Sequence, residues 1–274
     1  MPFGLKNAGT TYQRLVIKMF KDQMRDTMEV YIDDMLVKSR NKEDNLSDLS
    51  RTFEILRKYR MKINASKCSF GVQSGKFHGY LISKRGTEAN PEHIDAINRV
   101  QPPRTIREVQ KLTRMLAALN RLISKSSEKC KSFFQLLRGN KIVDWNQDCS
   151  QALNELKAYL SSPPLLVIPQ EDDALYLYLA VSNHAVSAAL VCEKAGIQHP
   201  VYYASKTLLD AEHRYIPLEK LAFALVVASR KLKYYFEAHT IIILTSHPLK
   251  AILRKADLSG RLSKWSVELG QFDI

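Results

Sequence analysis

The chain has 274 residues, of which 45% are hydrophobic, and its formal net charge is +13 at pH 7. This composition excludes a disordered, collagen-like or low-complexity chain, and no apolar run approaches the ~20 residues of a membrane-spanning helix. All of the excess positive charge lies in residues 1–144, with 28 Lys and Arg against 15 Asp and Glu, because residues 145–274 hold 13 of each.

The first part of the chain alternates helical and strand patterns. Apolar residues recur at helical spacing over residues 8–20 and again from Leu46 to Leu56, which predicts two amphipathic helices. Residues 28–38 predict two short strands around an acidic turn, since aspartate side chains bond nearby backbone in turns. Residues 61–71 and 76–86 carry spaced glycines and predict further short strands.

A helical stretch follows. Thr105 and Glu108 form a capping box at the start of a helix whose apolar stripe continues to Ile123. Residues 149–160 predict another helix, and Pro163 ends it.

The last third has a different pattern, with several short strands. We expect strands at 175–181, 186–191, 201–205 and 240–245, and a helix from Pro217 to about Phe236. Strands in this order around one helix predict a small mixed α/β sheet, so the whole chain is expected to be an α+β protein of several domains.

The cysteines and the N-terminal residues indicate in which cellular compartment the protein is expected. The four cysteines are widely spaced and form no CxxC pair, which favours free thiols in a reducing compartment. The first residues show no basic region followed by an apolar core, so no signal peptide is expected. We therefore expect an intracellular protein, cytoplasmic or nuclear, with no membrane partner.

The sharpest chemical feature is the sequence from Tyr31 to Asp34 (YIDD). Asp33 and Asp34 are adjacent carboxylates at a tight turn between apolar strands. Such a pair can hold Mg²⁺, which prefers carboxylate oxygens together with substrate phosphates, and two such ions can drive phosphoryl transfer. The alternative is an ordinary solvated turn.

Several motifs together resemble one family. MPFGLKNAGTTYQ, YIDD, LRKYRMKINASKCSFG, KFHGYLISKRG and VYYASKTLLDAEHRYIPLEKLAFALV follow one another in the order seen in the Pol polyprotein of gypsy-type LTR retrotransposons, most of all the plant-type ones. The resemblance implies a partial reverse transcriptase palm at 1–86, a helical thumb at 87–144, and a degenerate, truncated ribonuclease-H-like domain at 145–274.

The resemblance also implies roles for residues of the polymerase region. Asp33 and Asp34 would be catalytic, Mg²⁺-binding carboxylates, and Tyr31 would lie beside the primer terminus. The remaining residues would bind nucleotide or primer: Phe3 and Gly4 near the incoming nucleotide, Lys67 near its triphosphate, and Phe77 and Gly79 in the primer-grip hairpin. The alternatives are core packing for Phe3, Tyr31 and Phe77, and a solvated side chain for Lys67.

The family's polymerase site contains a further aspartate on a strand that precedes MPFG. Because the sequence starts at Met1 of that motif, and neither Asp22, Asp26 nor Glu29 is a convincing substitute, we expect that the chain by itself does not polymerise DNA.

The ribonuclease-H-like part departs from its family at the acidic positions. Where the family has Asp-Ala-Ser, this chain has Ala180, Val181 and Ser182, and Ser246 stands where another aspartate is usual. Glu219 matches the helix carboxylate, and a fourth acid would follow Ile274. We therefore expect a vestigial site that does not cleave RNA–DNA hybrids.

Two further groups of charged residues lie in this part of the chain, one acidic and one basic. Asp172 and Asp173 precede the strand, but Asp173 is expected about 23 Å from Ala180 at ~3.3 Å per residue, too far to share a metal ion. Residues 231–236 (KLKYYF) could form a basic and aromatic nucleic-acid surface. We favour a helix end with its aromatic residues packed inward.

Three functional hypotheses remain open. In the first, the chain is a segment of a Pol polyprotein, binds an RNA/DNA template-primer through residues 1–144, and acts with the remainder of the polyprotein. In the second, it is a noncatalytic nucleic-acid-binding remnant, which the basic first part favours over a basic surface without a partner. In the third, it is the product of a decayed open reading frame.

Overall fold

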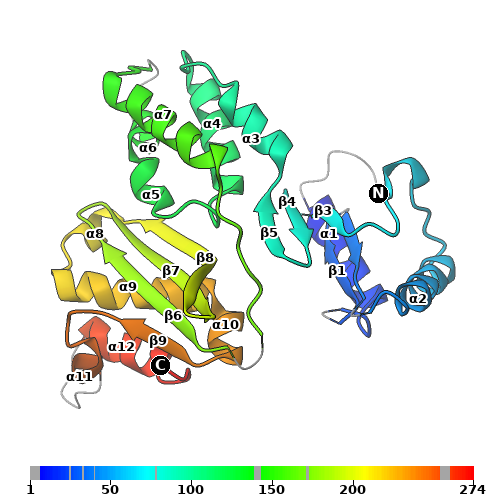
Figure 1. Cartoon of the computed structure of the whole chain (residues 1–274). Coiled ribbons are helices and arrows are strands. Elements are labelled where there is room, and N and C mark those ends of the chain that lie inside the picture. Colours follow the sequence, from blue (N-terminus) through cyan, green and yellow to red (C-terminus); the bar gives the residue numbers. More distant parts are fainter. Residues whose placement is uncertain are drawn as a thin grey trace. The chain divides into compact units, whose positions relative to one another are not determined.

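The structure is a computed structural model. It describes residues 7–24, 26–32, 34–39, 41–77, 79–138, 143–170, 173–253 and 260–274. The described chain divides into two compact units, Met1–Lys84 and Arg85–Ile274 (Figure 1), and each is considered by itself. The mixed α+β architecture predicted from the sequence is confirmed.

The first unit combines two helices with two antiparallel hairpins. Helices α1 (Ala8–Met19) and α2 (Asn45–Lys58) accompany the hairpin of β1 (Met28–Tyr31) and β2 (Asp34–Val37). The second hairpin consists of β3 (Ser74–Phe77) and β4 (Tyr80–Ser83). These elements confirm the two predicted helices and the acidic hairpin.

Apolar residues of α1, α2 and β1 form the core of this unit. The buried side chains are Val16, Met19, Phe20, Met28, Val30 and Leu56. Their spacing on α1 is three and four residues, so one face of that helix is buried against the sheet.

The strand predicted within residues 61–71 is wrong. This segment contains a short 3-10 helix, Ala65–Lys67, and otherwise no regular element. The side chain of Asn64 accepts hydrogen bonds from the Ser66 backbone N–H at 3.1 Å and from the Ser66 hydroxyl at 2.7 Å. Such local bonds compete with strand pairing, which explains the difference.

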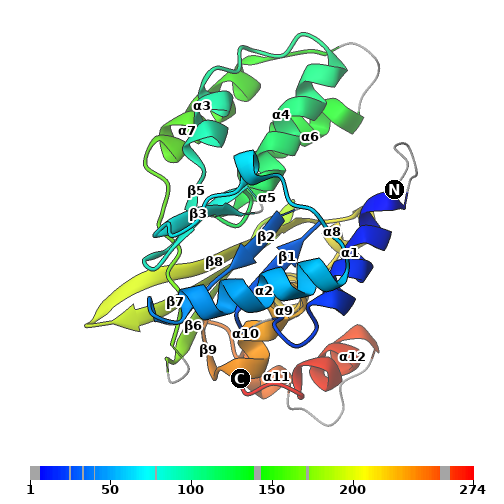
Figure 2. The same cartoon turned by 90° about the vertical axis from the view of Figure 1, so that its right-hand side faces the viewer.

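The second unit begins with a strand and a group of helices. They are β5 (Gly86–Ala89), α3 (Pro91–Asn98), α4 (Ile106–Ala118), α5 (Ser126–Lys129), α6 (Lys131–Arg138) and α7 (Gln147–Ser161). Helix α3 lies beside α7, and α4 lies beside α6 (Figure 2). The predicted capping box of Thr105 and Glu108 is confirmed at the start of α4. That helix ends before Ile123, but Leu122 and Ile123 stay buried in the following turn.

Strand β5 meets the segment after α7 closely. Thr87 and Leu166 form an antiparallel bridge, and Gly86 has φ +140°. A Cβ atom at Gly86 would lie 2.1 Å from the Leu166 carbonyl oxygen, so this approach requires glycine.

A four-stranded mixed sheet forms the rest of the second unit. Its strands are β6 (Leu175–Val181), β7 (Ala185–Lys194), β8 (Ile197–Thr207) and β9 (Ile241–Leu244), in the order β8-β7-β6-β9. Only β6 and β9 run parallel. The predicted strands and the mixed sheet are therefore confirmed.

Helices cover this sheet and extend beyond it (Figure 1). They are α8 (Asp210–His213), α9 (Pro217–Lys231), α10 (Lys233–Ala238), α11 (Leu249–Leu253) and α12 (Gly260–Leu269). Helix α9 is buried along most of its length and packs on Leu175, Leu177 and the facing residues of β7. The single helix predicted to about Phe236 divides at Leu232, whose φ of −112° and ψ of 24° leave the helical region.

In the part of the chain that the structure describes, no helix has both the length and the apolar character needed to cross a membrane.

Candidate functional site

The acidic turn lies at the tip of the β1–β2 hairpin. Tyr31 pairs with Asp34, and only Ile32 and Asp33 lie between them in the sequence. Asp34 is exposed, while Asp33, like Phe3 and Gly4, lies outside the described residues. Tyr31 is 43% exposed, so core packing does not account for this residue.

Ile32 adopts an unusual backbone conformation at this tip. Its φ is 51°, in the left-handed region that β-branched residues rarely occupy. Such a conformation costs on the order of 1–3 kcal/mol and persists only where surrounding contacts impose it.

The side chain of Gln13, on α1, supplies contacts of this kind. Its Nε2 donates to the Val30 carbonyl oxygen at 3.0 Å, and its Oε1 accepts a hydrogen bond from the Ile32 backbone N–H. Sequence reasoning missed Gln13. A signal was present, because a polar residue precedes Val16 and Phe20 by three and seven positions on the buried face of α1.

The other polymerase candidates occupy exposed or half-buried positions. Lys67 ends the short 3-10 helix and is exposed. Phe77 ends β3, is half-buried and pairs with Tyr80, and Gly79 has φ +81° at the connection of β3 and β4. A hairpin thus stands where the resemblance implies the primer grip.

In the second unit, two of the predicted positions lie at the carboxyl ends of neighbouring parallel strands, Ala180 near the end of β6 and Ser246 just after β9. Tyr178 of β6 is in register with Leu244 of β9. Ala180 and Ser246 each follow that pair by two residues, so they lie at the same end of the sheet. Neither residue offers a carboxylate.

The third predicted position, Glu219, reaches the same end by the chain path. Strand β8 ends beside the start of β7, and the chain then enters the loop that leads to α9. This loop is bonded to the β6–β7 connection, because the Leu208 N–H donates to the His184 carbonyl at 2.8 Å and His213 Nδ1 lies 2.6 Å from the Asn183 carbonyl oxygen.

Glu219 is engaged within the protein. Its Oε2 accepts from the Ile216 backbone N–H at 3.3 Å and lies 3.5 Å from Nη1 of Arg261. Arg261, on α12, also lies over the ring of Tyr215 at 4.1 Å from its centroid. No sequence pattern indicates Arg261 as the partner of Glu219, because 42 residues separate the two.

Ser182, which stands at the serine of the expected Asp-Ala-Ser triplet, is hydrogen-bonded within the protein. Its hydroxyl donates to Oε2 of Glu128 on α5 at 2.7 Å and accepts from the N–H groups of His184 and Ala185 at 3.1 and 3.0 Å. Glu128 therefore fixes the β6–β7 connection to the helical region. Sequence reasoning did not single it out.

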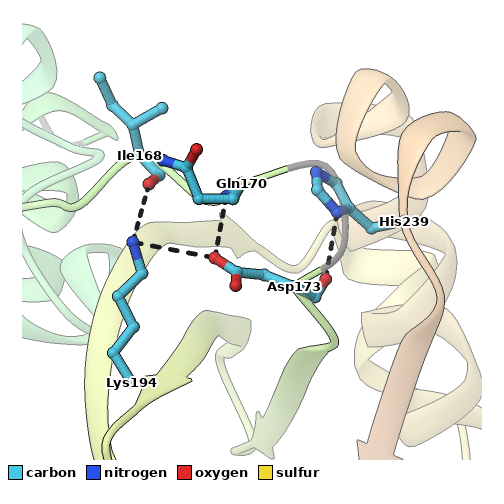
Figure 3. A network of polar contacts seen from close by, with 5 residues as sticks. All are labelled: Ile168, Gln170, Asp173, Lys194 and His239. Atoms are coloured by element: carbon cyan, nitrogen blue, oxygen red, sulfur yellow. Dashed lines mark hydrogen bonds and ion pairs between the residues drawn. The ribbon is translucent and has the colours of Figure 1, made fainter.

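Asp173 takes part in a separate network at the opposite end of β6 (Figure 3). Its carboxylate accepts from the Gln170 N–H at 2.8 Å and lies 3.8 Å from Lys194 Nζ, while His239 Nδ1 is 3.1 Å from its carbonyl oxygen. These partners agree with the expectation that Asp173 does not join a site at Ala180.

The basic and aromatic segment 231–236 agrees with the helix-end interpretation. Lys231 Nζ donates to the Ser205 carbonyl at 2.5 Å, and burial lowers the pKa of this lysine. Phe236 is buried, and burial raises the pKa of Tyr235, whereas Tyr234 is exposed.

The positions at the end of the second-unit sheet do not fit a divalent metal ion. Two of them lack a carboxylate, and the third carboxylate is paired with a guanidinium. Across the described residues, no three His, Cys, Asp or Glu side chains gather into a possible metal site.

Family models match both units. A model described as "Reverse transcriptase (RNA-dependent DNA polymerase)" matches residues 1–82, and one described as "RNase H-like domain found in reverse transcriptase" matches residues 145–243. The Pol polyprotein from transposon opus of Drosophila melanogaster is 27% identical over all of this chain. The Tf2-3 polyprotein of Schizosaccharomyces pombe is 25% identical over 97% of it. This chain corresponds to a segment of an LTR retrotransposon Pol polyprotein.

The Pol segment spans 28% of the opus polyprotein and 20% of the Tf2-3 polyprotein. Solved structures share its fold. The foamy viral protease-reverse transcriptase in complex with RNA/DNA hybrid has a TM-score of 0.74 and 22% identity, and covers 98% of the segment with 37% of its own chain. The same viral protein in complex with dsDNA has a TM-score of 0.75 and 21% identity. The match covers 100% of the segment and 58% of the viral chain.

Proposed function

We propose that this Pol segment takes part in RNA-directed DNA synthesis and that its residues 1–86, 87–144 and 145–274 serve as palm, thumb and noncatalytic ribonuclease-H-like domain. The observation that carries the proposal is the hairpin tip with the adjacent Asp33 and Asp34, in the part matched by the reverse transcriptase family. We further propose that the element is gypsy-type and of plant origin, on the motifs quoted above.

In this proposal, Asp33 and Asp34 hold Mg²⁺. The ion would supply charge neutralisation at the nucleotide triphosphate and at the attacking primer oxygen. Tyr31, which is exposed and pairs with Asp34, contacts the primer terminus. Lys67, Phe3 and Gly4 contact the nucleotide, and the hairpin with Phe77 and Gly79 supports the primer.

Helix α4 provides a basic surface for the template-primer. Arg104 lies two residues before the helix and is exposed. Arg107, Lys111 and Arg114 of α4 are also exposed and recur every three or four residues, so they share one face of the helix, which we call the α4 basic stripe. Glu108 is the acidic residue among them. A pocket of about 610 Å³ that Arg104 and Lys111 help to line lies beside the stripe. Phosphate contacts by such cations supply most nonspecific affinity for nucleic acid.

The ribonuclease-H-like domain is proposed to have a structural role. Ala180 and Ser246 offer no metal ligand, and Glu219 caps α9 and pairs with Arg261. Accordingly, the full chain leaves an RNA–DNA hybrid uncut in Mg²⁺, and Glu219→Gln leaves this result unchanged. Magnesium-dependent cutting that this substitution abolishes would overturn the proposed role.

The location is proposed to be intracellular, cytoplasmic or nuclear, which the four free thiols support. The remainder of a Pol polyprotein is the proposed protein partner. Genomic sequence on both sides of the coding region tests the type of element.

The central experiment maps the metal on the full chain bound to an RNA–DNA template-primer. Fe²⁺ replaces Mg²⁺ and reduces added hydrogen peroxide to hydroxyl radicals, which cut the backbone near the bound iron, while ascorbate returns the Fe³⁺ to Fe²⁺. We expect cuts around residues 31–36 that disappear in Asp33→Asn/Asp34→Asn. The matched control is Glu43→Gln/Asp44→Asn, which changes two adjacent acids of the same unit that are both exposed.

The outcomes separate the candidate functions. Cuts at the hairpin tip support a metal-binding polymerase region. Salt-dependent duplex binding without cuts favours the noncatalytic binding remnant, for which the α4 basic stripe is the specific observation. A chain that neither folds nor binds points to a decayed reading frame.

A further inference from the structure

Gln13 bonds to the one backbone edge of the acidic hairpin that β2 does not use. In the antiparallel pair, Tyr31 lies opposite Asp34 and turns its own backbone groups toward β2. The carbonyl of Val30 and the N–H of Ile32, which flank Tyr31, therefore point to the other side. The Gln13 amide contacts both groups, with one donor and one acceptor.

This amide fits the edge as a neighbouring strand would. A primary amide presents a C=O and an N–H side by side, as a peptide group does, and it can satisfy a backbone acceptor and a backbone donor at once. The backbone N–H that donates to the Gln13 Oε1 atom belongs to Ile32, the residue with φ 51°. The hydrogen bond thus acts on the least favourable backbone position of the hairpin tip.

The packing of helix α1 fixes the position of the Gln13 backbone relative to β1. Val16 and Phe20, three and seven residues after Gln13, are fully buried against Met28 and Val30 of β1. The backbone of Gln13 can therefore move away from the hairpin only if these buried side chains lose their contacts.

We propose that Gln13 is a positioning residue for the acidic turn: its side-chain amide holds Ile32 in the left-handed conformation and so sets the direction in which the chain leaves β1 toward Asp34. The inference rests on the proposed polymerase function for its purpose, but the conformational claim stands on the two hydrogen bonds alone.

The test compares four variants of the full chain. Gln13→Met keeps the length of the side chain and removes both hydrogen bonds. Ile32→Gly makes the left-handed conformation intrinsically accessible, and the double variant combines both changes. Gln73→Met makes the same chemical change at an exposed glutamine of the same unit.

The first readout is amide hydrogen exchange by NMR. In Gln13→Met we expect the Ile32 and Asp34 amides to exchange about 10-fold faster, in line with the loss of a net hydrogen bond. The core amides of Val16 and Leu56 keep their protection. Ile32→Gly in the Gln13→Met background restores the protection of Asp34, whereas Gln73→Met behaves as wild type.

The second readout is the Fe²⁺ cutting pattern at residues 31–36. We expect Gln13→Met to weaken it severalfold and Gln13→Met/Ile32→Gly to restore it. Unchanged exchange at Ile32 and Asp34 in Gln13→Met overturns the proposal, and so does faster exchange that extends to the whole core. If wild type is never cut, the proposed metal function fails, while the exchange data still decide the role of Gln13.

Discussion

The guanidinium of Arg261 lies 3.5 Å from the Glu219 carboxylate and stacks on Tyr215 with its Cζ atom 4.1 Å from the ring centroid. Among the three positions that the resemblance predicts in this part of the sequence, Ala180, Glu219 and Ser246, only Glu219 carries a carboxylate. Its partner is a cation of α12. The carboxylate thus joins α9 to α12, which is a structural role that needs no metal ion.

Substitution of Arg261 should loosen α12. Arg261→Met is expected to lower the free energy of unfolding by about 1–2 kcal/mol, because the partly exposed ion pair and the stacking on Tyr215 each contribute about 0.5–1 kcal/mol. Limited proteolysis within α12 should become faster. Lys264→Met, an exposed residue of the same helix, serves as the control. Equal effects from both substitutions would contradict a specific role for the pair.

Introducing aspartates at Ala180 and Ser246 should make the Tm of the protein depend on Mg²⁺. Ala180→Asp/Ser246→Asp places two carboxylates at one end of the sheet, where like charges are destabilising until a cation binds. Without Mg²⁺, we expect the aspartate double variant to have a lower Tm than the control Ala180→Asn/Ser246→Asn. The difference should be about 2–4 °C for each kcal/mol of repulsion between the carboxylates.

Saturating Mg²⁺ should recover the Tm of the aspartate variant and leave the asparagine control and wild type unchanged. Differential scanning calorimetry with and without Mg²⁺ measures this effect. If Mg²⁺ does not raise the Tm of the aspartate variant above that of its control, the two positions do not converge as the sheet register indicates.

Sequence patterns predicted the elements whose signals are local. The stripe of Val16 and Phe20 identified α1, and Thr105 with Glu108 marked the start of α4. The segment at Asn64 was misassigned because its side-chain bonds to Ser66 replace strand pairing, and alternation cannot reveal that competition.

The partners of the site residues were less accessible to sequence reasoning. Glu219 and Arg261, or Ser182 and Glu128, meet only after the chain has folded, and no local spacing connects them. Gln13 is different, since a polar residue on a buried helix face suggests a specific partner. Its partner is backbone, and residue types alone do not identify a backbone group.

The start of α4 should depend on pH. The carboxylate of Glu108 accepts from the Arg104 N–H at 2.7 Å and the Thr105 N–H at 3.3 Å, and these backbone hydrogen bonds lower its pKa. A group whose pKa is lowered by folding stabilises the fold above its unfolded pKa of about 4.3 and loses this contribution as the pH falls through the folded pKa.

The difference in unfolding free energy between wild type and Glu108→Gln should therefore be largest at neutral pH and vanish in acid. Thr105→Ala, which removes the other half of the capping box, should cost about 1 kcal/mol, and Thr105→Ser should retain most of the stability. Denaturant unfolding at a series of pH values provides the measurement. A difference that grows on acidification would contradict the assignment.

The α4 basic stripe should determine how strongly duplex binding depends on salt. Replacing Arg107, Lys111 and Arg114 with glutamine removes three cations from one exposed helix face. If each contacts a phosphate, the slope of log K against log salt should fall in magnitude by about 3, and the affinity should decrease for every sequence alike. Fluorescence anisotropy with a labelled RNA–DNA template-primer measures both quantities.

The control triple variant, Lys233→Gln/Lys250→Gln/Lys264→Gln, removes the same number of exposed cations from the neutral part of the chain. Its slope should change by less than about 1, because overall charge alone acts weakly beyond the ~10 Å Debye length at 0.1 M salt. Equal slopes for the two triple variants would mean that net charge, and not the α4 basic stripe, holds the duplex.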